Sequence, residues 1–242
     1  MSEPTDFLQS VRASSAELVQ DVEAQRWSDT DAATPSLCPG WTRGHVLTHL
    51  ARNADGIAAT LAAAMRDEIV ARYPDGWDAR NADIDAGADR PLATLLADVR
   101  ESAQRLDRVL GALTDAEAWQ RPTENGHPAQ YWLAQRWREV EIHRVDLAGS
   151  YTPDRWPPLF VATLLPEVAR TLAERTSGAV QVSVVADGSL SPDTAGASWS
   201  AGEGDDPVEV RGPDWAVLAW LVGRASVAEA ALSATPALAD WR

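Results

Sequence analysis

The segment RWREVEIHRVDL at residues 136–147 carries a helical pattern that indicates how the N-terminal part of the chain folds. At about 100° per residue, Glu139, His143 and Asp146 fall within roughly 60° of one another on a helix. Apolar residues border this polar stripe on both sides: Leu133, Val140 and Leu147 on one, Ile142 on the other. Such a stripe is expected to face the interior of a helical bundle. Glu141 lies about 160° from the centre of the stripe and is therefore expected to face solvent.

Glu139 and His143 lie one helical turn apart, which suits two ligands of one metal ion from a single helix. A buried carboxylate and imidazole are costly unless they are paired or bind metal. A third ligand must then come from a facing helix, where His49 is available and His45, one turn earlier, is the alternative. An ordinary surface pair has the same spacing as Glu139 and His143. One core and one solvated histidine would explain His45 and His49 equally well, so spacing alone leaves the site open.

Four segments with helical apolar periodicity predict four long helices. Their approximate bounds are 6–26, 43–71, 91–119 and 129–148. Thr42 precedes the second helix and is suited to cap it. Residues 72–90 contain one proline and two glycines and show no clear period, so a long linker of the kind that is often functional is expected there. The pattern predicts an all-α four-helix bundle over residues 1–150.

The sequence changes in character after Tyr151, where a proline-rich link begins. The expected elements are a helix ending near Arg175, strands at 180–185 and 208–211, a weaker strand near Trp199 and a last helix at 214–231. Turns rich in glycine, serine and aspartate separate the strands. Residues 151–242 are therefore predicted to form a small α+β domain.

Composition narrows the possible partners of this 242-residue chain. Its formal net charge of −15 argues against nucleic acid, and an anionic ligand would need a local group of cations. No apolar run approaches the roughly 20 residues that cross a bilayer, and the start of the chain does not resemble a signal peptide. A monomer or weak homo-oligomer in the cytoplasm is expected. The single cysteine, Cys38, follows a leucine in a turn with no paired histidine and is expected to be a small packing residue.

Four segments together resemble the mycothiol-dependent maleylpyruvate isomerase family, which belongs to the wider DinB-like bundle group. They are PGWTRGHVLTHL at 39–50, ARNADI at 79–84, REVEIHRVDL at 138–147 and Gly223-Arg224. The segment at 138–147 is the most specific, because it fixes two ligands and an aspartate at set spacings. The resemblance runs nearly end to end and implies a DinB-like four-helix bundle followed by a sterol-carrier-like α+β domain.

The resemblance also implies a ligand set. It assigns a divalent metal, with zinc as the expected ion, to His49, Glu139 and His143. It thereby selects His49 over His45, which spacing could not do. Two histidines and one glutamate leave a fourth position open, as is usual for catalytic zinc.

Further roles are implied for residues outside this ligand set. The resemblance gives catalytic importance to Asp146 and Arg224, and a substrate-binding or thiol-binding role to Arg80 and Asn81. Asp146 could instead cap the helix or pair with an arginine, and Arg224 could instead form a salt bridge between the two domains.

The reaction that the resemblance implies is the isomerisation of maleylpyruvate, a dicarboxylate, with the thiol mycothiol as cofactor. A thiolate adds to the cis double bond, the resulting single bond rotates, and loss of the thiolate gives fumarylpyruvate, a step in the catabolism of aromatic compounds through gentisate. One alternative is a mycothiol S-transferase, which would need the same metal ligands. The other is a non-catalytic binding module in which metal staples the bundle through a fourth protein ligand, such as His45 or Asp146.

Overall fold

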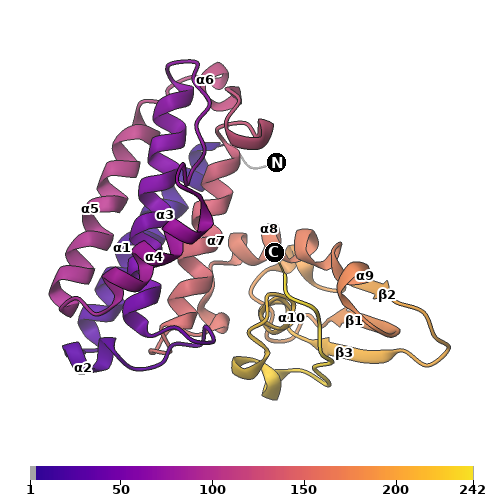
Figure 1. Cartoon of the computed structure of the whole chain (residues 1–242). Coiled ribbons are helices and arrows are strands. Elements are labelled where there is room, and N and C mark those ends of the chain that lie inside the picture. Colours follow the sequence, from indigo (N-terminus) through magenta and orange to yellow (C-terminus); the bar gives the residue numbers. More distant parts are fainter. Residues whose placement is uncertain (1–3, 242) are drawn as a thin grey trace. The chain divides into compact units, whose positions relative to one another are not determined.

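The computed structural model describes residues 4–241 and divides the chain into two compact units, Met1–Ser150 and Tyr151–Arg242. The first unit is helical, and its four longest helices lie side by side (Figure 1). Its helices are α1 (Pro4–Ala24), α2 (Asp29–Ala32), α3 (Arg43–Ala64), α4 (Gly76–Ala88), α5 (Leu92–Gly111), α6 (Ala116–Gln120) and α7 (Tyr131–Asp146).

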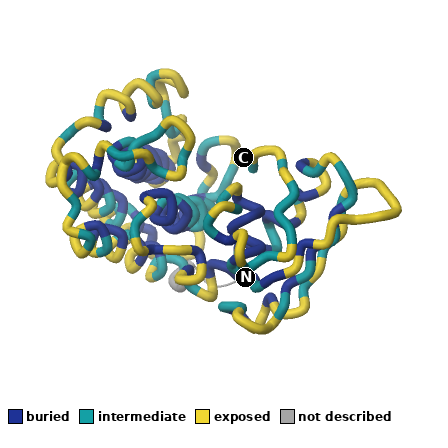
Figure 2. The backbone as a smooth tube through the Cα atoms, turned by 90° about the horizontal axis from the view of Figure 1, so that it is seen from below, coloured by how far each residue is buried: buried dark blue, intermediate teal, exposed yellow. Residues whose placement is uncertain are grey.

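Helix α3 lies at the centre of the first unit, where it contacts α4, α5 and α7, while α1 contacts α5 and α7. Its sequence explains this position, because α3 itself carries apolar and small residues on most of its faces, and 16 of its 22 residues are buried. Figure 2 shows the buried residues gathered along the inner faces of the helices. The core is therefore built around the helix that carries His49.

The start of α3 is fixed by a reciprocal cap. Thr42 Oγ1 accepts a hydrogen bond from the His45 backbone N–H at 3.3 Å, and His45 Nδ1 accepts one from the Thr42 backbone N–H at 3.2 Å. This is the geometry of a capping box, with a histidine where glutamate or glutamine is usual. The predicted capping role of Thr42 is confirmed, and the ring of His45 is committed to the helix start.

Residues 72–90 differ from the predicted linker, because most of them form helix α4. Only Ile84 and Ala88 of this helix are buried, so the sequence shows no apolar period. Glycines allow α4 to lie directly on α3: a Cβ at Gly44 would stand 2.1 Å from the Ala88 carbonyl oxygen, and one at Gly87 would stand 2.6 Å from Thr48 Cγ2. Helix α4 therefore adds a helix to the four that were predicted.

Three predicted helix ends are also wrong. The second and third long helices end at Ala64 and Gly111, earlier than predicted. The last helix, α10 (Asp214–Leu221), ends ten residues before the predicted position. Gly223 has a φ of +81° and the Arg224 N–H donates to the Ala219 carbonyl at 2.7 Å, which is the Schellman ending that glycine favours.

The second unit is a small α+β structure, as predicted. Its other elements are α8 (Pro158–Ala169), α9 (Leu172–Arg175), β1 (Val180–Val184), β2 (Ser198–Ala201) and β3 (Val208–Gly212). The sheet order is β2-β1-β3, with β1 antiparallel to β2 and parallel to β3. Helix α10 is almost entirely buried and packs on α8, which accounts for its apolar sequence. Among the described residues, no helix combines the length and apolar character that spanning a membrane requires.

Candidate metal centre

Three side chains from two helices of the first unit converge on one point. His49 Nε2 on α3 lies 2.8 Å from Glu139 Oε2 on α7, and His143 Nε2, one turn further along α7, lies 3.4 Å from the same oxygen. One ligand atom from each of these residues lies within 4.8 Å of the others. The imidazole of His49 is 5% exposed, while His143 and Glu139 are 16% and 24% exposed. The three residues therefore form a cluster that could hold one metal ion and that solvent reaches through Glu139 and His143.

His143 is held in a fixed orientation from behind. Its Nδ1 lies 2.8 Å from Oδ2 of Asp146, whose side chain is fully buried. A carboxylate that accepts from the far ring nitrogen of a histidine is a common support for a metal ligand, because it leaves the lone pair of Nε2 facing the ion. Asp146 therefore supports His143 and does not belong to the ligand cluster itself.

Cys38 also contacts this support, which corrects the expectation that it has no histidine nearby. Its Sγ lies 3.2 Å from Asp146 Oδ2 and 3.8 Å from His143 Nδ1. The turn that carries it is tied to α7 because the Leu37 N–H donates to the Asp146 carbonyl at 2.9 Å. Cys38 packs against the apolar core as well, so its packing role is retained. The contact joins a turn to a distant helix, and helical periodicity alone could not predict it.

His45 lies outside the cluster. Its Nδ1 caps α3, and its Nε2 lies 3.6 Å from Asp85. The structure thus brings His49, and not His45, to Glu139. A local requirement at the helix start separates two histidines that look equivalent in the sequence.

His49 differs from His143 in the group that faces its second ring nitrogen. Arg80 of α4 places Nη2 2.6 Å from His49 Nδ1. Because a guanidinium group only donates hydrogen bonds, Nδ1 must be the acceptor here. The proton of the neutral imidazole is then on Nε2, which donates it to Glu139. Arg80 also donates from Nη1 to Asn81 Oδ1 at 2.8 Å, so both residues implied in ligand binding lie beside the cluster, Asn81 through Arg80.

The electrostatics agree with these proton positions. Burial lowers the pKa of His49 to about 4, although Glu139 attracts its charged form. Burial would also lower the pKa of His143, but hydrogen bonds with Asp146, Cys38 and Glu139 raise it well above its usual value. Burial would raise the pKa of Glu139, but the two histidines hold it well below its usual value. The cluster thus contains a neutral His49, an anionic Glu139 and a cationic His143.

The donor set fits a divalent transition metal. Two imidazole nitrogens and one carboxylate oxygen are the ligands that zinc accepts in open catalytic sites. His143 is already oriented for this role by Asp146. His49 fits with one change: a lone pair on Nε2 requires the proton to be on Nδ1, and Arg80 must then leave Nδ1. Metal binding at His49 would thus displace Arg80, which is a neighbour of the cluster and not one of its ligands.

The structure contradicts the prediction for Glu141, and it places Arg224 in the second unit. Glu141 is fully buried, and the hydroxyl of Ser14 on α1 donates to it; it does not face solvent, because α1 packs on the side of α7 away from α3. Arg224 lies in the second unit, directly after Gly223, and its Nη1 donates to the Val222 carbonyl at 2.7 Å. Its catalytic role remains a prediction.

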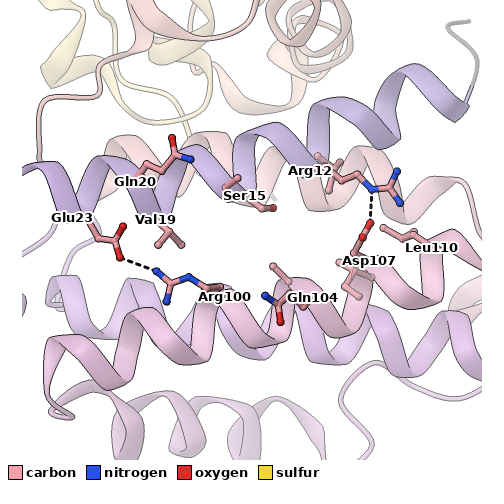
Figure 3. Close-up of a pocket in the computed structure, with 13 residues that line it drawn as sticks. Arg12, Ser15, Val19, Gln20, Glu23, Arg100, Gln104, Asp107 and Leu110 are labelled. Atoms are coloured by element: carbon pink, nitrogen blue, oxygen red, sulfur yellow. Dashed lines mark hydrogen bonds and ion pairs between the residues drawn. The ribbon is translucent and has the colours of Figure 1, made fainter.

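A separate groove of about 540 Å³ lies between α1 and α5 (Figure 3). Val11, Val19, Leu106 and Leu110 are among its apolar lining residues. Its polar rim is paired: Arg12 contacts Asp107, and Arg100 Nη2 lies 2.8 Å from Glu23 Oε1. None of its lining residues belongs to the His49–Glu139–His143 cluster, so the groove and the cluster are separate features of the first unit.

The first unit is thus a helical bundle with a His–Glu–His cluster between two of its helices, an arrangement that could hold one metal ion. The family model of the mycothiol maleylpyruvate isomerase N-terminal domain matches residues 8–148. The chain therefore belongs to the mycothiol maleylpyruvate isomerase family, as its sequence motifs predicted.

Comparison with solved structures extends the shared fold to the whole chain. Two crystal structures match with a TM-score of 0.83, one of the mycothiol-dependent maleylpyruvate isomerase at 24% identity and one of a histidine-to-alanine mutant at 23%. Each alignment covers 99% of this chain and 98% of the other. At these identities the likeness establishes the fold. A search of curated protein sequences finds no match.

Proposed function

We propose that the protein isomerises maleylpyruvate to fumarylpyruvate in a mycothiol-dependent reaction, with a divalent metal, zinc in particular, held by His49, Glu139 and His143. The observation that carries this proposal is the convergence of these three side chains in a bundle of this family, with their ligand atoms within 4.8 Å of one another. His45 and Asp146, the two candidates for a closing fourth ligand, are engaged elsewhere. This favours a catalytic ion over a structural staple.

A divalent metal bound there would lower the pKa of a coordinated thiol, so that a thiolate is present at neutral pH. The chain's own residues then have defined tasks. Asp146 holds His143 with its Nε2 toward the cluster, and buried α3 holds His49 in place. Glu139 is kept anionic by the two histidines. The side chains are thus arranged before any ligand arrives, which reduces the reorganisation that catalysis must cover.

The proposed reaction is balanced without a redox partner. The thiolate sulfur forms a bond to one carbon of the cis double bond, and the electron pair moves onto the conjugated carbonyl as an enolate. The former double bond between the two carbons is now a single bond and can rotate. Return of the electron pair then restores the double bond, breaks the carbon–sulfur bond and releases the trans isomer and the thiolate. Arg224 is proposed to stabilise the negative charge that develops on the enolate.

The test is an isomerisation assay with and without mycothiol on metal-loaded protein. Turnover that requires mycothiol and returns it unchanged supports the proposal. Stoichiometric consumption of the thiol would instead identify an S-transferase, and absence of turnover with metal bound would refute the proposal.

The Arg224→Ala variant tests the enolate assignment. Loss of one group that stabilises developing charge costs on the order of 100-fold in turnover, and the metal content should stay at the wild-type level. Arg170→Ala, which changes an exposed arginine after α8, is the matched control. Near wild-type activity in Arg224→Ala would leave this residue a structural role.

A further inference from the structure

Four buried nitrogen atoms that could donate hydrogen bonds have no partner in the described part of the chain. They are Nδ2 of Asn53 and Nε of Arg72, Arg80 and Arg136. Leaving a buried N–H unpaired is costly, and such groups point to a missing acceptor. All four atoms are donors, so the group that they require is a hydrogen-bond acceptor. Because three of the four belong to guanidinium groups, which are positively charged, this acceptor is expected to be an anion.

Two of these donors come from the helices that carry the metal cluster. Asn53 follows His49 by one turn on α3, and Arg136 precedes Glu139 by one turn on α7. Arg136 is 1% exposed and donates from Nη1 to Asn53 Oδ1 at 2.9 Å and to the Leu50 carbonyl at 2.8 Å. Because Arg136 can only donate, the amide of Asn53 must direct its oxygen toward Arg136 and its nitrogen away. These hydrogen bonds hold the two side chains in place, and Arg136 gives the pair a positive charge.

The other two, Arg72 and Arg80, come from the segment that leads into α4 and from α4 itself. Both guanidinium groups lie over the same two rings: Arg72 is 4.8 Å from the Tyr73 ring centre and 5.8 Å from that of Trp77, and Arg80 is 5.6 Å and 5.7 Å from them. Aromatic faces attract such cations but do not satisfy their N–H groups.

Neither guanidinium group forms an ion pair in the described part of the chain, although the chain has a net charge of −15; Glu124 accepts a hydrogen bond at 3.2 Å only from the backbone N–H of Arg72. Arg52 and Arg100 of the same unit form ion pairs with Asp98 and Glu23 at 2.7 and 2.8 Å. Within residues 4–241, no ion pair involves the side chain of Arg72 or Arg80. Two cations that lie over the same two aromatic rings and form no ion pair with a carboxylate are suited to an anion from outside.

Gly56 determines where Arg72 lies. A Cβ at this position would stand 2.7 Å from Arg72 Cγ and 3.0 Å from the Arg72 carbonyl oxygen. Gly56 follows His49 by seven residues on α3, so both lie on one face of that helix about two turns apart. Arg80 thus contacts His49 itself, whereas the stem of Arg72 contacts α3 about two turns further along, so Arg80 is the nearer of the two residues to the cluster.

We propose that Arg72 and Arg80 bind the two carboxylates of the substrate, with Arg80 nearer the metal cluster and Arg72 farther from it. The inference rests on the proposed function in taking a dicarboxylate as the substrate. It assigns Arg72 a specificity role, because a two-cation site distinguishes a dicarboxylate from a monocarboxylate of equal length. Arg80 becomes available for this role when a metal on His49 displaces it from Nδ1.

The experiment measures ligand binding on zinc-loaded protein by calorimetry. Heptanedioate is the dicarboxylate probe, because its two carboxylates end a seven-carbon chain as those of maleylpyruvate do, and heptanoate is the monocarboxylate of the same length. Arg72→Met keeps the apolar stem beneath the aromatic rings and removes the charge, while Arg72→Lys keeps the charge. Arg66→Met is the matched control, because Arg66 is an exposed arginine before the same segment, paired with Glu68 at 2.7 Å.

A charge-assisted hydrogen bond contributes enough that its loss should raise the dissociation constant of heptanedioate about tenfold or more in Arg72→Met. The monocarboxylate should be affected less, Arg72→Lys should recover part of the affinity, and Arg66→Met should behave as wild type. Zinc content and thermal unfolding, measured for each variant, separate a binding defect from loss of metal or fold.

An unchanged heptanedioate affinity in folded, zinc-loaded Arg72→Met would overturn the inference, as would failure of the wild-type protein to bind heptanedioate. Loss of heptanedioate binding in Arg72→Met without mycothiol-dependent turnover by the wild type would refute the proposed reaction and leave the carboxylate site standing. Turnover by the wild type with normal heptanedioate binding in Arg72→Met would refute the carboxylate site alone.

Discussion

The two histidines of the cluster face opposite kinds of neighbour at the ring nitrogen that points away from Glu139. On the α7 side, a buried carboxylate, Asp146, faces His143 Nδ1. On the α3 side, a guanidinium group, Arg80, faces His49 Nδ1. An acceptor behind the ring favours a free lone pair at Nε2, whereas a donor behind the ring favours a proton there. The α7 side is therefore oriented for metal in advance and needs only to release the second proton of the cationic His143, whereas the α3 side must reorganise.

The largest effect is expected from removing a ligand on the prearranged side. His143→Ala should reduce bound zinc from about one equivalent per chain to near zero, because two remaining ligands hold zinc weakly. Elemental analysis of purified protein measures this. His127→Ala is the control, since the His127 ring stacks on Tyr131 at 3.9 Å and does not belong to the His49–Glu139–His143 cluster. Full metal content in His143→Ala would reject the ligand assignment.

A smaller loss is expected when the support is changed and the ligand is kept. Asp146→Asn preserves the shape of the side chain but removes the charge behind His143, and changes of this type weaken metal binding about 10- to 100-fold. Competition with a chromophoric chelator gives the affinity. Asp85→Asn, at an exposed carboxylate 3.6 Å from His45 Nε2, should leave it unchanged. Equal affinities for both variants would show that the support of His143 is unimportant.

The same side should determine the pH dependence of metal binding. The raised pKa of His143 means that its imidazole carries an extra proton near neutral pH, and the metal must displace that proton. Apparent affinity should therefore rise with pH, by about tenfold per unit while one proton is released. His49, with a pKa of about 4, adds to this dependence only in acid. Chelator competition between about pH 6 and 8 measures the slope, and a flat profile would contradict a cationic His143.

The smallest effect, and one of opposite sign, is expected on the α3 side. Arg80→Gln removes the strong donor behind His49 Nδ1, so the proton can move there without expelling a cation. Metal affinity should increase roughly fivefold, the equivalent of one ordinary hydrogen bond. The chelator assay measures it, with Arg66→Gln as control. A weaker affinity in Arg80→Gln would mean that Arg80 supports the metal form of the site.

The contrast between the two sides also explains what the sequence could predict. Glu139, His143 and Asp146 lie on one helix, and their mutual placement follows from helical geometry alone. His49 required knowledge of which face of α3 meets α7, and only the family motif separated it from His45. Spacing could not find that separation, because it depends on the capping geometry at Thr42.

The errors have a common physical origin in tertiary packing. Glu141 was expected in solvent because the helical wheel shows one polar stripe and one opposite face, but α1 covers that opposite face. Helix α4 was missed because only Ile84 and Ala88 of it are buried, so burial left almost no periodic trace in its sequence. The contacts of Cys38 and Arg80 depend on these same arrangements and were therefore out of reach of periodicity.

The glycines at 44, 56 and 87 give the site an unusual sensitivity. None of them belongs to the cluster, yet each lies where α3 packs against α4 or the preceding segment so closely that a Cβ atom has no room. A single methyl group at such a contact would push residues 72–88 away from α3. The distances from the Arg72 and Arg80 guanidinium groups to a bound ligand would then increase together. Ligand preference in this protein can therefore drift through changes in the hidden surface of one helix, while every chemically active side chain keeps its identity.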